Sequence, residues 1–156
     1  MSVAKRLKDY LDQNNVKYIH MSHSPAYTAQ EIAAVMHVPG KELAKTVIVK
    51  ADEGFVMAVL PASRKVNLEL LRNAIGAKSI KLADEKEFAA LFPDCDVGGM
   101  PPFGNLYNIP VYVASDLTED KEIVFNAGTH TDVIRMSYSD FERLVKPKVA
   151  NFDEPV

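Results

Sequence analysis

The residues from Asp96 to Gly104 (Asp-Val-Gly-Gly-Met-Pro-Pro-Phe-Gly) form the stretch whose types and spacing are best suited to holding a ligand. Three of the chain's seven glycines and two of its nine prolines fall within it. Glycine reaches backbone angles that other residues avoid and lets another molecule approach the main chain. Proline fixes φ and removes an N–H donor. The stretch is therefore predicted to be a loop that presents backbone groups to a ligand, and a tight connection without a ligand is the alternative interpretation.

Two side chains outside this loop have types and positions that suit chemistry. Lys45 stands at the head of the apolar run 46–49, where a charge is costly unless it reaches solvent or an anion. It is predicted to be a point charge for phosphate at the mouth of a pocket; the alternative is a surface lysine that extends along the strand end. His130 follows a predicted strand and a glycine, and histidine suits proton transfer near neutral pH. An ordinary turn histidine is the alternative there.

Several other chemistries are disfavoured by the residues themselves. His20 and His23 have His-x-x-His spacing, but an extended segment directs them to opposite faces, and no Cys or carboxylate pattern completes a metal site. Cys95 lies between two aspartates, which disfavour a nucleophilic thiolate. The glycine loop lacks the nucleotide-binding spacings, and no serine has the nucleophile-elbow pattern. If the chain is an enzyme, water or a substrate group is predicted to attack.

The elements that must position these residues follow from apolar spacing and capping signals. Helices are predicted over residues 2–14, 28–37, 67–76, 84–92 and 137–145. Strands are predicted over residues 16–21, 46–49, 55–60, 79–82, 110–114, 122–126 and 132–136. The turn at 52–54 predicts that the second and third strands form a hairpin. Because both of these strands are apolar on both faces, they are expected in the centre of a sheet that is covered on both sides.

This order of elements predicts an α+β fold with a mixed, partly barrel-like β-sheet surrounded by helices, and not a doubly wound parallel sheet. Residues 1–156 are predicted to form a single domain, which at this length can bury a full core. Residues 148–156 are polar and have little to bury, so they are expected to be a loosely held tail.

Composition limits the classes of partner. The net charge of −3 argues against a surface that coats DNA or RNA broadly, although a small patch that grips one end of an RNA is still allowed. No apolar run approaches the roughly 18 residues of a membrane span, and the N-terminus lacks the apolar block of a signal peptide. A single cysteine excludes an intramolecular disulfide. The predicted location is the cytoplasm, with no membrane and no DNA as partner.

Short motifs follow one another in a fixed order along residues 20–145. They are Thr28-x-x-Glu31-Ile32-Ala33, Val38-Pro39, Leu43 to Lys50, Val59-Leu60-Pro61, Gly98 to Gly104, Ile109-Pro110-Val111 and Ala127 to His130. This ordered set resembles the YbaK/EbsC-type aminoacyl-tRNA deacylases, relatives of the editing insertion domain of bacterial prolyl-tRNA synthetase. Each motif is common by itself, and the ordered set is specific.

The resemblance implies a sheet of the kind described above and hydrolysis of the ester that joins a wrong amino acid to tRNA. Lys45 falls on the lysine of the family's Lys-Thr motif and would hold the phosphate–ribose end of the tRNA. His130 fits the histidine of the prolyl-editing branches that remove small residues such as alanine, so both are candidate catalytic residues. Substrate contacts are implied for Tyr27, Thr46, Gly98, Gly99, Met100, Pro101, Pro102, Gly104, Gly128 and Thr129. No metal or organic cofactor is implied.

Ester hydrolysis requires an anchored substrate, donors for the developing oxyanion and a placed water. The N–H groups of Gly98 and Gly99 are predicted donors, each typically worth about 3 kcal/mol in other enzymes. The predicted function is a free-standing trans-editing deacylase that acts on the acceptor end of Ala-tRNA(Pro). The involvement of an aminoacyl-tRNA synthetase is left open. The alternatives are a deacylase for another mischarged tRNA such as Cys-tRNA(Pro), and a non-catalytic module that binds aminoacyl or tRNA ends.

Overall fold

The computed structural model describes residues 4–23, 29–36, 38–52 and 54–156. The helices are α1 (Lys5–Gln13), α2 (Ala29–Met36), α3 (Leu68–Ile75), α4 (Glu85–Ala89) and α5 (Tyr138–Val145), with short 3-10 helices η1 (Gly104–Tyr107) and η2 (Ser115–Glu119). The strands are β1 (Tyr18–Ser22), β2 (Leu43–Ala51), β3 (Gly54–Pro61), β4 (Arg64–Val66), β5 (Ile80–Leu82), β6 (Val111–Ala114), β7 (Glu122–Asn126), β8 (Asp132–Ser137), β9 (Lys148–Ala150) and β10 (Asp153–Pro155). Among these residues, no helix is long and apolar enough to cross a membrane.

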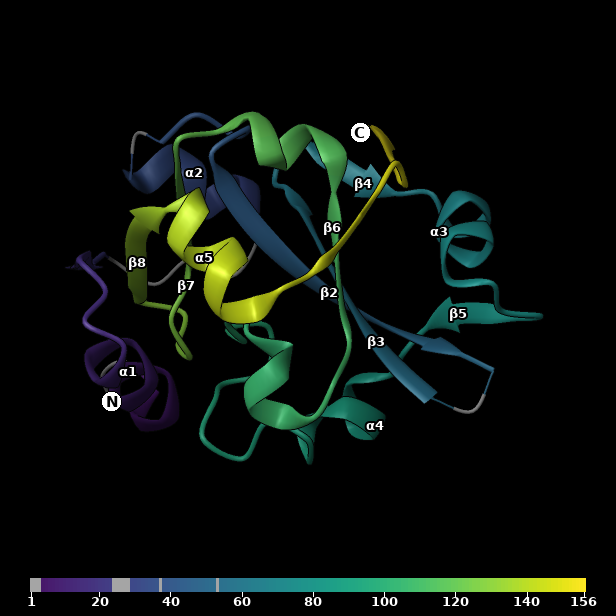
Figure 1. Ribbon diagram of the computed structural model, residues 1–156, viewed down its shortest axis with the longest axis horizontal. Coiled ribbons are helices and arrows are strands. Elements are labelled where there is room, and N and C mark those ends of the chain that lie inside the picture. Colours follow the sequence, from purple (N-terminus) through teal and green to yellow (C-terminus); the bar gives the residue numbers. More distant parts are fainter. Residues whose placement is uncertain (1–3, 24–28, 37, 53) are drawn as a thin grey trace.

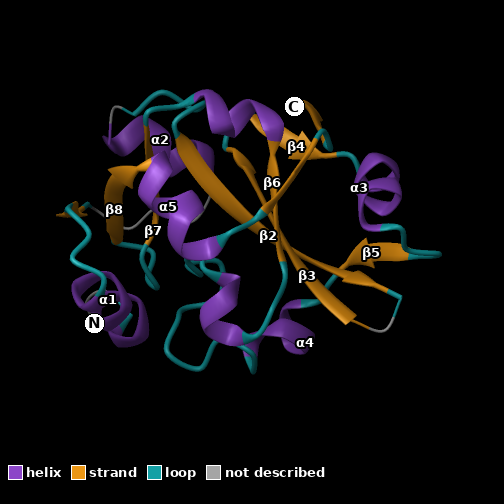
Figure 2. Cartoon of the chain, in the orientation of Figure 1, coloured by secondary structure: helices purple, strands orange, loops and turns teal. Residues whose placement is uncertain are grey.

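A mixed sheet organises the chain, with strands in the order β1–β8–β7–β2–β3–β6–β9 and with β5 added to β2 (Figure 1). The pairs β2–β7, β3–β6 and β6–β9 are parallel, and the other pairs of this sheet are antiparallel. Figure 2 shows the twisted strands in the middle of the molecule with helices around them, and β4 and β10 pair in a separate two-stranded sheet. The path has two ends, at β1 and β9, so the sheet is open. The predicted mixed α+β architecture is confirmed.

The core lies on both faces of the central hairpin β2–β3, as its apolar sequence predicts. Because successive strand residues point to opposite faces, Ala44 and Ile48 contribute to one cluster, which α1 and α5 cover through Leu7, Leu11 and Phe141. The opposite face of the hairpin packs against two separate groups of apolar side chains. Leu43 packs with Ile32 of α2, and Val49 packs with Leu71 of α3 and with Phe152.

Local capping explains where two helices begin and end. The Asn67 side chain accepts a hydrogen bond from the Leu70 N–H at 3.0 Å, and Gly76 ends α3 with a φ of 80°. The Ser137 hydroxyl accepts one from the Asp140 N–H at 3.1 Å and opens α5. The predicted boundaries of these two helices therefore agree with the structure. Helix α4 ends at Ala89, before the expected end near residue 92.

The prediction of a loosely held tail over residues 148–156 is wrong. Strand β9 pairs in parallel with β6, and β10 pairs antiparallel with β4. Phe152, between the two strands, is completely buried, and its carbonyl accepts a hydrogen bond from the Asn67 N–H at 2.7 Å. One aromatic anchor and the free edges of β6 and β4 hold a segment whose composition is otherwise polar.

Candidate functional site

Two loops that are distant in sequence meet through their backbones. The Asp96 N–H donates to the Gly128 carbonyl at 2.7 Å, and the Gly128 N–H donates to the Gly99 carbonyl at 2.8 Å. Gly98 and Gly128 have φ values of 87° and 106°, in the region that favours glycine. The glycine loop is thus fixed against the turn that follows β7.

The glycines of the first loop allow it to approach the second very closely. A Cβ atom on Gly98 would lie 3.1 Å from Cε1 of His130. A Cβ on Gly99 would lie 2.9 Å from the carbonyl carbon and oxygen of Thr129. The structure therefore brings together five of the predicted site residues: Gly98, Gly99, Gly128, Thr129 and His130.

The N–H groups of the glycine loop already have partners. The Gly99 N–H donates to the Asp96 carbonyl at 2.9 Å, and the Gly98 N–H donates to Sδ of Met100 at 3.2 Å. Both predicted oxyanion donors therefore have acceptors in this structure, and a substrate oxygen would have to replace them. The thioether is a weak acceptor, so the Gly98 N–H is the one that a substrate oxygen would compete for more easily.

The second half of the loop belongs to the core. Met100, Pro101 and Pro102 are buried, and a Cβ on Gly104 would lie 2.5 Å from the Ile109 carbonyl oxygen. These four predicted contacts are therefore buried, whereas Gly98 is exposed, and they pack beneath the exposed part of the loop. Tyr27, another predicted contact, lies outside the described residues.

Lys45 enters the site through the parallel pairing of β2 with β7. The paired positions end at Ala44 and Phe125, so Lys45 and Asn126 come next on neighbouring strands and share a face of the sheet. Burial lowers the pKa of the Lys45 ammonium below its ordinary value. The described residues offer this ammonium neither an ion pair nor a hydrogen bond. Thr46, the next predicted contact, points to the opposite face of β2 from Lys45.

Asn126 connects Lys45 to the glycine loop and was not recognised as a site residue from the sequence. Its Nδ2 donates to the Gly98 carbonyl at 3.4 Å. Its Oδ1 is buried and, within the part of the chain that the structure describes, has no hydrogen-bond partner. An amide between a cation and a glycine loop, with a free acceptor, is suited to a substrate N–H or O–H donor. Asn126 comes next to Lys45 only through the pairing of β2 with β7, which the sequence does not show.

Asp132 anchors the turn that carries His130 and was also missed. Its Oδ2 accepts from the Thr129 hydroxyl at 2.7 Å, and its Oδ1 contacts Nε2 of His20 at 2.6 Å and the Ser22 hydroxyl at 3.1 Å. Burial alone would raise the pKa of Asp132, but the hydrogen bonds from Thr129, His20 and Ser22 outweigh it and hold the pKa below its ordinary value. The side chain is therefore a buried carboxylate that binds the turn to β1.

The Cys95 thiol is poorly suited to act as a nucleophile in this arrangement. Burial raises the pKa of the Cys95 thiol to about 11, so the thiolate is disfavoured, as its aspartate neighbours predict. His20, half of the His-x-x-His pair, is bound to Asp132. The residues that the structure describes contain no cluster of three or more His, Cys, Asp or Glu side chains that could hold a metal ion.

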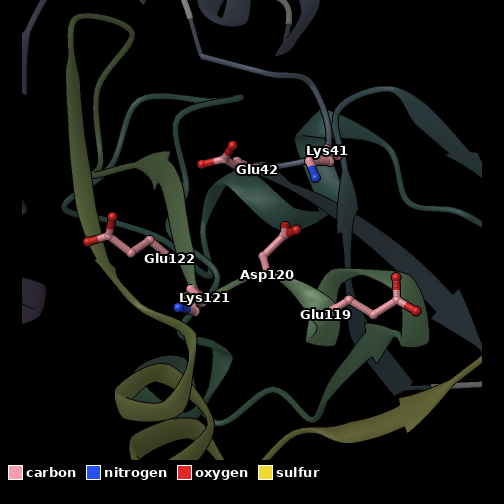
Figure 3. A pocket seen from close by; sticks show the side chains of 6 residues that line it. All are labelled: Lys41, Glu42, Glu119, Asp120, Lys121 and Glu122. Carbon is pink, nitrogen blue, oxygen red and sulfur yellow. The ribbon is translucent and has the colours of Figure 1, made fainter.

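A separate pocket of about 290 Å³ lies beside the start of β2 and has an acidic lining. Figure 3 shows Asp120 among the other five side chains: Lys41, Glu42, Glu119, Lys121 and Glu122. Burial, followed by the charge of Glu42, raises the pKa of Asp120 to about 6. Four carboxylates against two lysines repel a phosphate group, so this pocket does not compete with Lys45 as an anion site.

The open mixed sheet and the paired glycine loops define a domain of the kind that edits aminoacyl-tRNA. The model of the aminoacyl-tRNA editing domain family matches residues 23–144. This chain belongs to that family, as its motifs predict.

Relatives support the same assignment. The chain is 31% identical over 77 residues to the proline–tRNA ligase of Thermosipho africanus, a match that covers 49% of this chain and 14% of the ligase. It is 25% identical over 154 residues to the multifunctional Ser/Thr-tRNA deacylase ProXp-y of Escherichia coli K12, covering 95% and 91% of the two chains. A solved structure of a candidate trans-editing enzyme for prolyl tRNA synthetase has the same fold, with a TM-score of 0.82, 21% identity and coverage of 97% and 96%.

Proposed function

We propose that this protein is an aminoacyl-tRNA deacylase that hydrolyses the ester of a mischarged tRNA in trans, with Ala-tRNA(Pro) as its substrate. The observation that carries the proposal is Lys45. Its ammonium is partly buried, and the described residues give it no counter-charge. It lies near the glycine loop, in which Gly98 comes very close to the His130 imidazole. An anionic ligand that ends in a small group would satisfy both features.

Each group has a role in this reaction. Lys45 binds the terminal phosphate of the tRNA and turns a loose encounter into a positioned one. Asn126 accepts a hydrogen bond from the substrate's ammonium or ribose hydroxyl through Oδ1. His130 orients the attacking water or relays its proton. The Gly98 N–H exchanges its thioether partner for the developing oxyanion, which is a much stronger acceptor.

The closeness of Gly98 to His130 supports a small amino acid. A carbon atom added to Gly98 would lie 3.1 Å from the imidazole, which is a tight contact, so in this proposal a substrate side chain bound beside these two residues has to be small. Alanine meets this requirement better than proline, the cognate amino acid of tRNA(Pro). Cys-tRNA(Pro) remains an alternative substrate.

Serine and threonine esters are a second candidate, because the relative from E. coli that matches this chain almost end to end is named a Ser/Thr-tRNA deacylase. Proline–tRNA ligases match this chain over only a small part of their own length. Delivery of the substrate by a synthetase is also part of the proposal, because proline–tRNA ligases are among the relatives of this chain. A cytoplasmic location follows from this substrate, since aminoacyl-tRNA is made and used there.

The test is a panel of charged tRNAs with wild-type protein, Lys45→Ala and the control Lys17→Ala, which removes an exposed lysine on the segment before β1. Ala-tRNA(Pro) should be hydrolysed and Pro-tRNA(Pro) spared. Lys45→Ala should lower kcat/KM about 100-fold and reduce the slope of log kcat/KM against log salt by about 1. Lys17→Ala should do neither.

Selective hydrolysis of Ser-tRNA or Cys-tRNA(Pro) would support the proposed deacylase activity and show that the substrate is not Ala-tRNA(Pro). Binding of these tRNAs without hydrolysis faster than in buffer would contradict the enzyme and favour the non-catalytic binding module.

A further inference from the structure

Helix α1 packs against the two loops of the candidate site from the side of the sheet opposite to Lys45. Ala4, Leu7 and Leu11 belong to the same buried cluster as Ala44, whereas Lys45 points to the other face. The helix therefore approaches the site from behind and does not line it.

The first contact is made at the start of the helix. The Ala4 N–H donates to the Ala127 carbonyl at 2.8 Å, and Ala4 is 2% exposed. A Cβ atom on Gly128 would lie 2.7 Å from the Ala4 Cβ and 3.1 Å from the Ala4 nitrogen. The Ala127–Gly128 turn, two residues before His130, is thus pressed against the first backbone group of the helix.

The second contact reaches the segments that flank the glycine loop. The Arg6 guanidinium donates to the Leu106 carbonyl at 3.0 Å and lies 4.7 Å from the centre of the Tyr107 ring. The Tyr107 hydroxyl in turn donates to Oδ1 of Asp94 at 2.8 Å, two residues before the loop begins at Asp96. The helix therefore contacts the Ala127–Gly128 turn directly and reaches Asp94, two residues before the glycine loop, through Tyr107.

We propose that α1 is a positioning element and that Ala4 is its key residue. By fixing the Ala127–Gly128 turn, the Ala4 N–H sets the distance between His130 and Gly98, which a Cβ atom on Gly98 would reduce to a tight contact. Ala4 touches no reacting atom and acts only through the turn. The kinetic part of this inference rests on the proposed deacylase function, and the structural part does not.

The experiment compares Ala4→Pro with Lys5→Pro. Ala4 has a φ of −54°, which proline adopts without strain, so Ala4→Pro removes the N–H and places a ring carbon against the Ala127 carbonyl. Lys5 is the first helical residue, where proline is favoured, and the ψ of 126° at Ala4 suits a residue that precedes proline. Among the described residues, nothing accepts a hydrogen bond from the Lys5 N–H. The control therefore introduces the same ring one residue away from the contact.

Two readouts separate positioning from a general loss of stability. The Gly128 amide, which donates to Gly99, should exchange its hydrogen at least about tenfold faster in Ala4→Pro, while amides of the β2–β3 hairpin stay unchanged. With the best ester of the panel, kcat should fall about tenfold or more and KM should change less than about twofold. Lys5→Pro should match wild type in both measurements.

Equal Gly128 exchange in the two proline variants would overturn the inference, as would faster exchange with an unchanged kcat. A uniform rise at every amide would also overturn it, because it would show a purely structural role. If Ala4→Pro does not fold, Ala4→Val replaces it, since valine keeps the N–H and adds two methyl groups against Gly128. If the wild type hydrolyses no ester, the proposed function fails and the Gly128 exchange comparison still decides the structural inference.

Discussion

The His20 imidazole lies 2.6 Å from the Asp132 carboxylate, through Nε2 and Oδ1, across the antiparallel pair of β1 and β8. The other oxygen of Asp132 holds the Thr129 hydroxyl, whose oxygen accepts the Thr131 and Asp132 N–H groups at 3.1 and 3.0 Å. One buried carboxylate thus fixes the turn that contains His130 to the edge strand of the sheet.

Asp132→Asn should therefore loosen this turn. An amide has the same shape but one acceptor oxygen where the carboxylate has two, so either Thr129 or His20 loses its partner. The free energy of unfolding at pH 7 should fall by about 1–3 kcal/mol, and deacylation should fall with it. Denaturant unfolding of Asp132→Asn beside Asp140→Asn, a change on the surface of α5, measures the difference.

The difference in stability between wild type and Asp132→Asn should depend on pH, because folding lowers the pKa of Asp132. Because the pKa of Asp132 is lowered in the folded protein, its stabilising effect is present above the ordinary aspartate value of about 3.9 and is lost as pH falls through the lower, folded value. The free energies of unfolding of wild type and Asp132→Asn should therefore become equal as the pH falls below about 4. Equal stabilities at pH 7 would show that the network contributes nothing.

Gly98→Ala tests whether the narrow approach to His130 matters. The positive φ of 87° makes any L side chain strained there, by about 1–2 kcal/mol, and the new methyl group would press on Cε1. Turnover should drop at least about tenfold. The control is Gly54→Ala at the start of β3, where an added Cβ meets nothing closer than the Ala51 carbonyl at 3.9 Å. Full activity of Gly98→Ala would show that the close approach of Gly98 to His130 does not matter for substrate binding.

The raised pKa of Asp153 predicts that the protein becomes less stable as the pH rises towards neutrality. Burial, followed by the neighbouring Asp116 carboxyl group, raises the pKa of Asp153 to about 6, although Arg64 lies 3.5 Å away. A raised pKa stabilises the fold below the ordinary value and loses that effect as pH rises through 6. Because of Asp153, the wild type should be more stable at pH 5 than at pH 7.5, by about 1 kcal/mol.

Asp153→Asn should make this profile flatter, and Asp120→Asn should add to the effect because the pKa of Asp120 is also raised to about 6. Thermal unfolding at several pH values measures both. A wild-type midpoint that rises between pH 5 and pH 7.5 would contradict the prediction.

The parts of the fold that depend on local signals could be predicted from the sequence. The central hairpin follows from two apolar runs around a turn, and Asn67 and Ser137 mark helix starts through their own side chains. The two loops of the candidate site could be singled out because glycines cluster in one and a single glycine, Gly128, lies two residues before His130 in the other.

The remainder depends on pairing between distant segments, which no local pattern encodes. Asn126 looks like an ordinary strand end until β7 pairs in parallel with β2, and Asp132 looks like a strand start until His20 faces it from β1. The C-terminal segment was misjudged because Phe152, a single apolar residue among polar ones, suffices to anchor two short strands once β6 and β4 provide their edges.

The parallel pair of β2 and β7 also constrains the order in which activity can arise during synthesis of the chain. Lys45 is translated early, but its neighbour Asn126 and the turn with His130 are translated late, and parallel strands pair only after the intervening chain has been made. A nascent chain that ends before β7 contains Lys45 without Asn126 and His130. If the proposed function holds, such a chain could hydrolyse nothing until β7 has been made and has paired with β2.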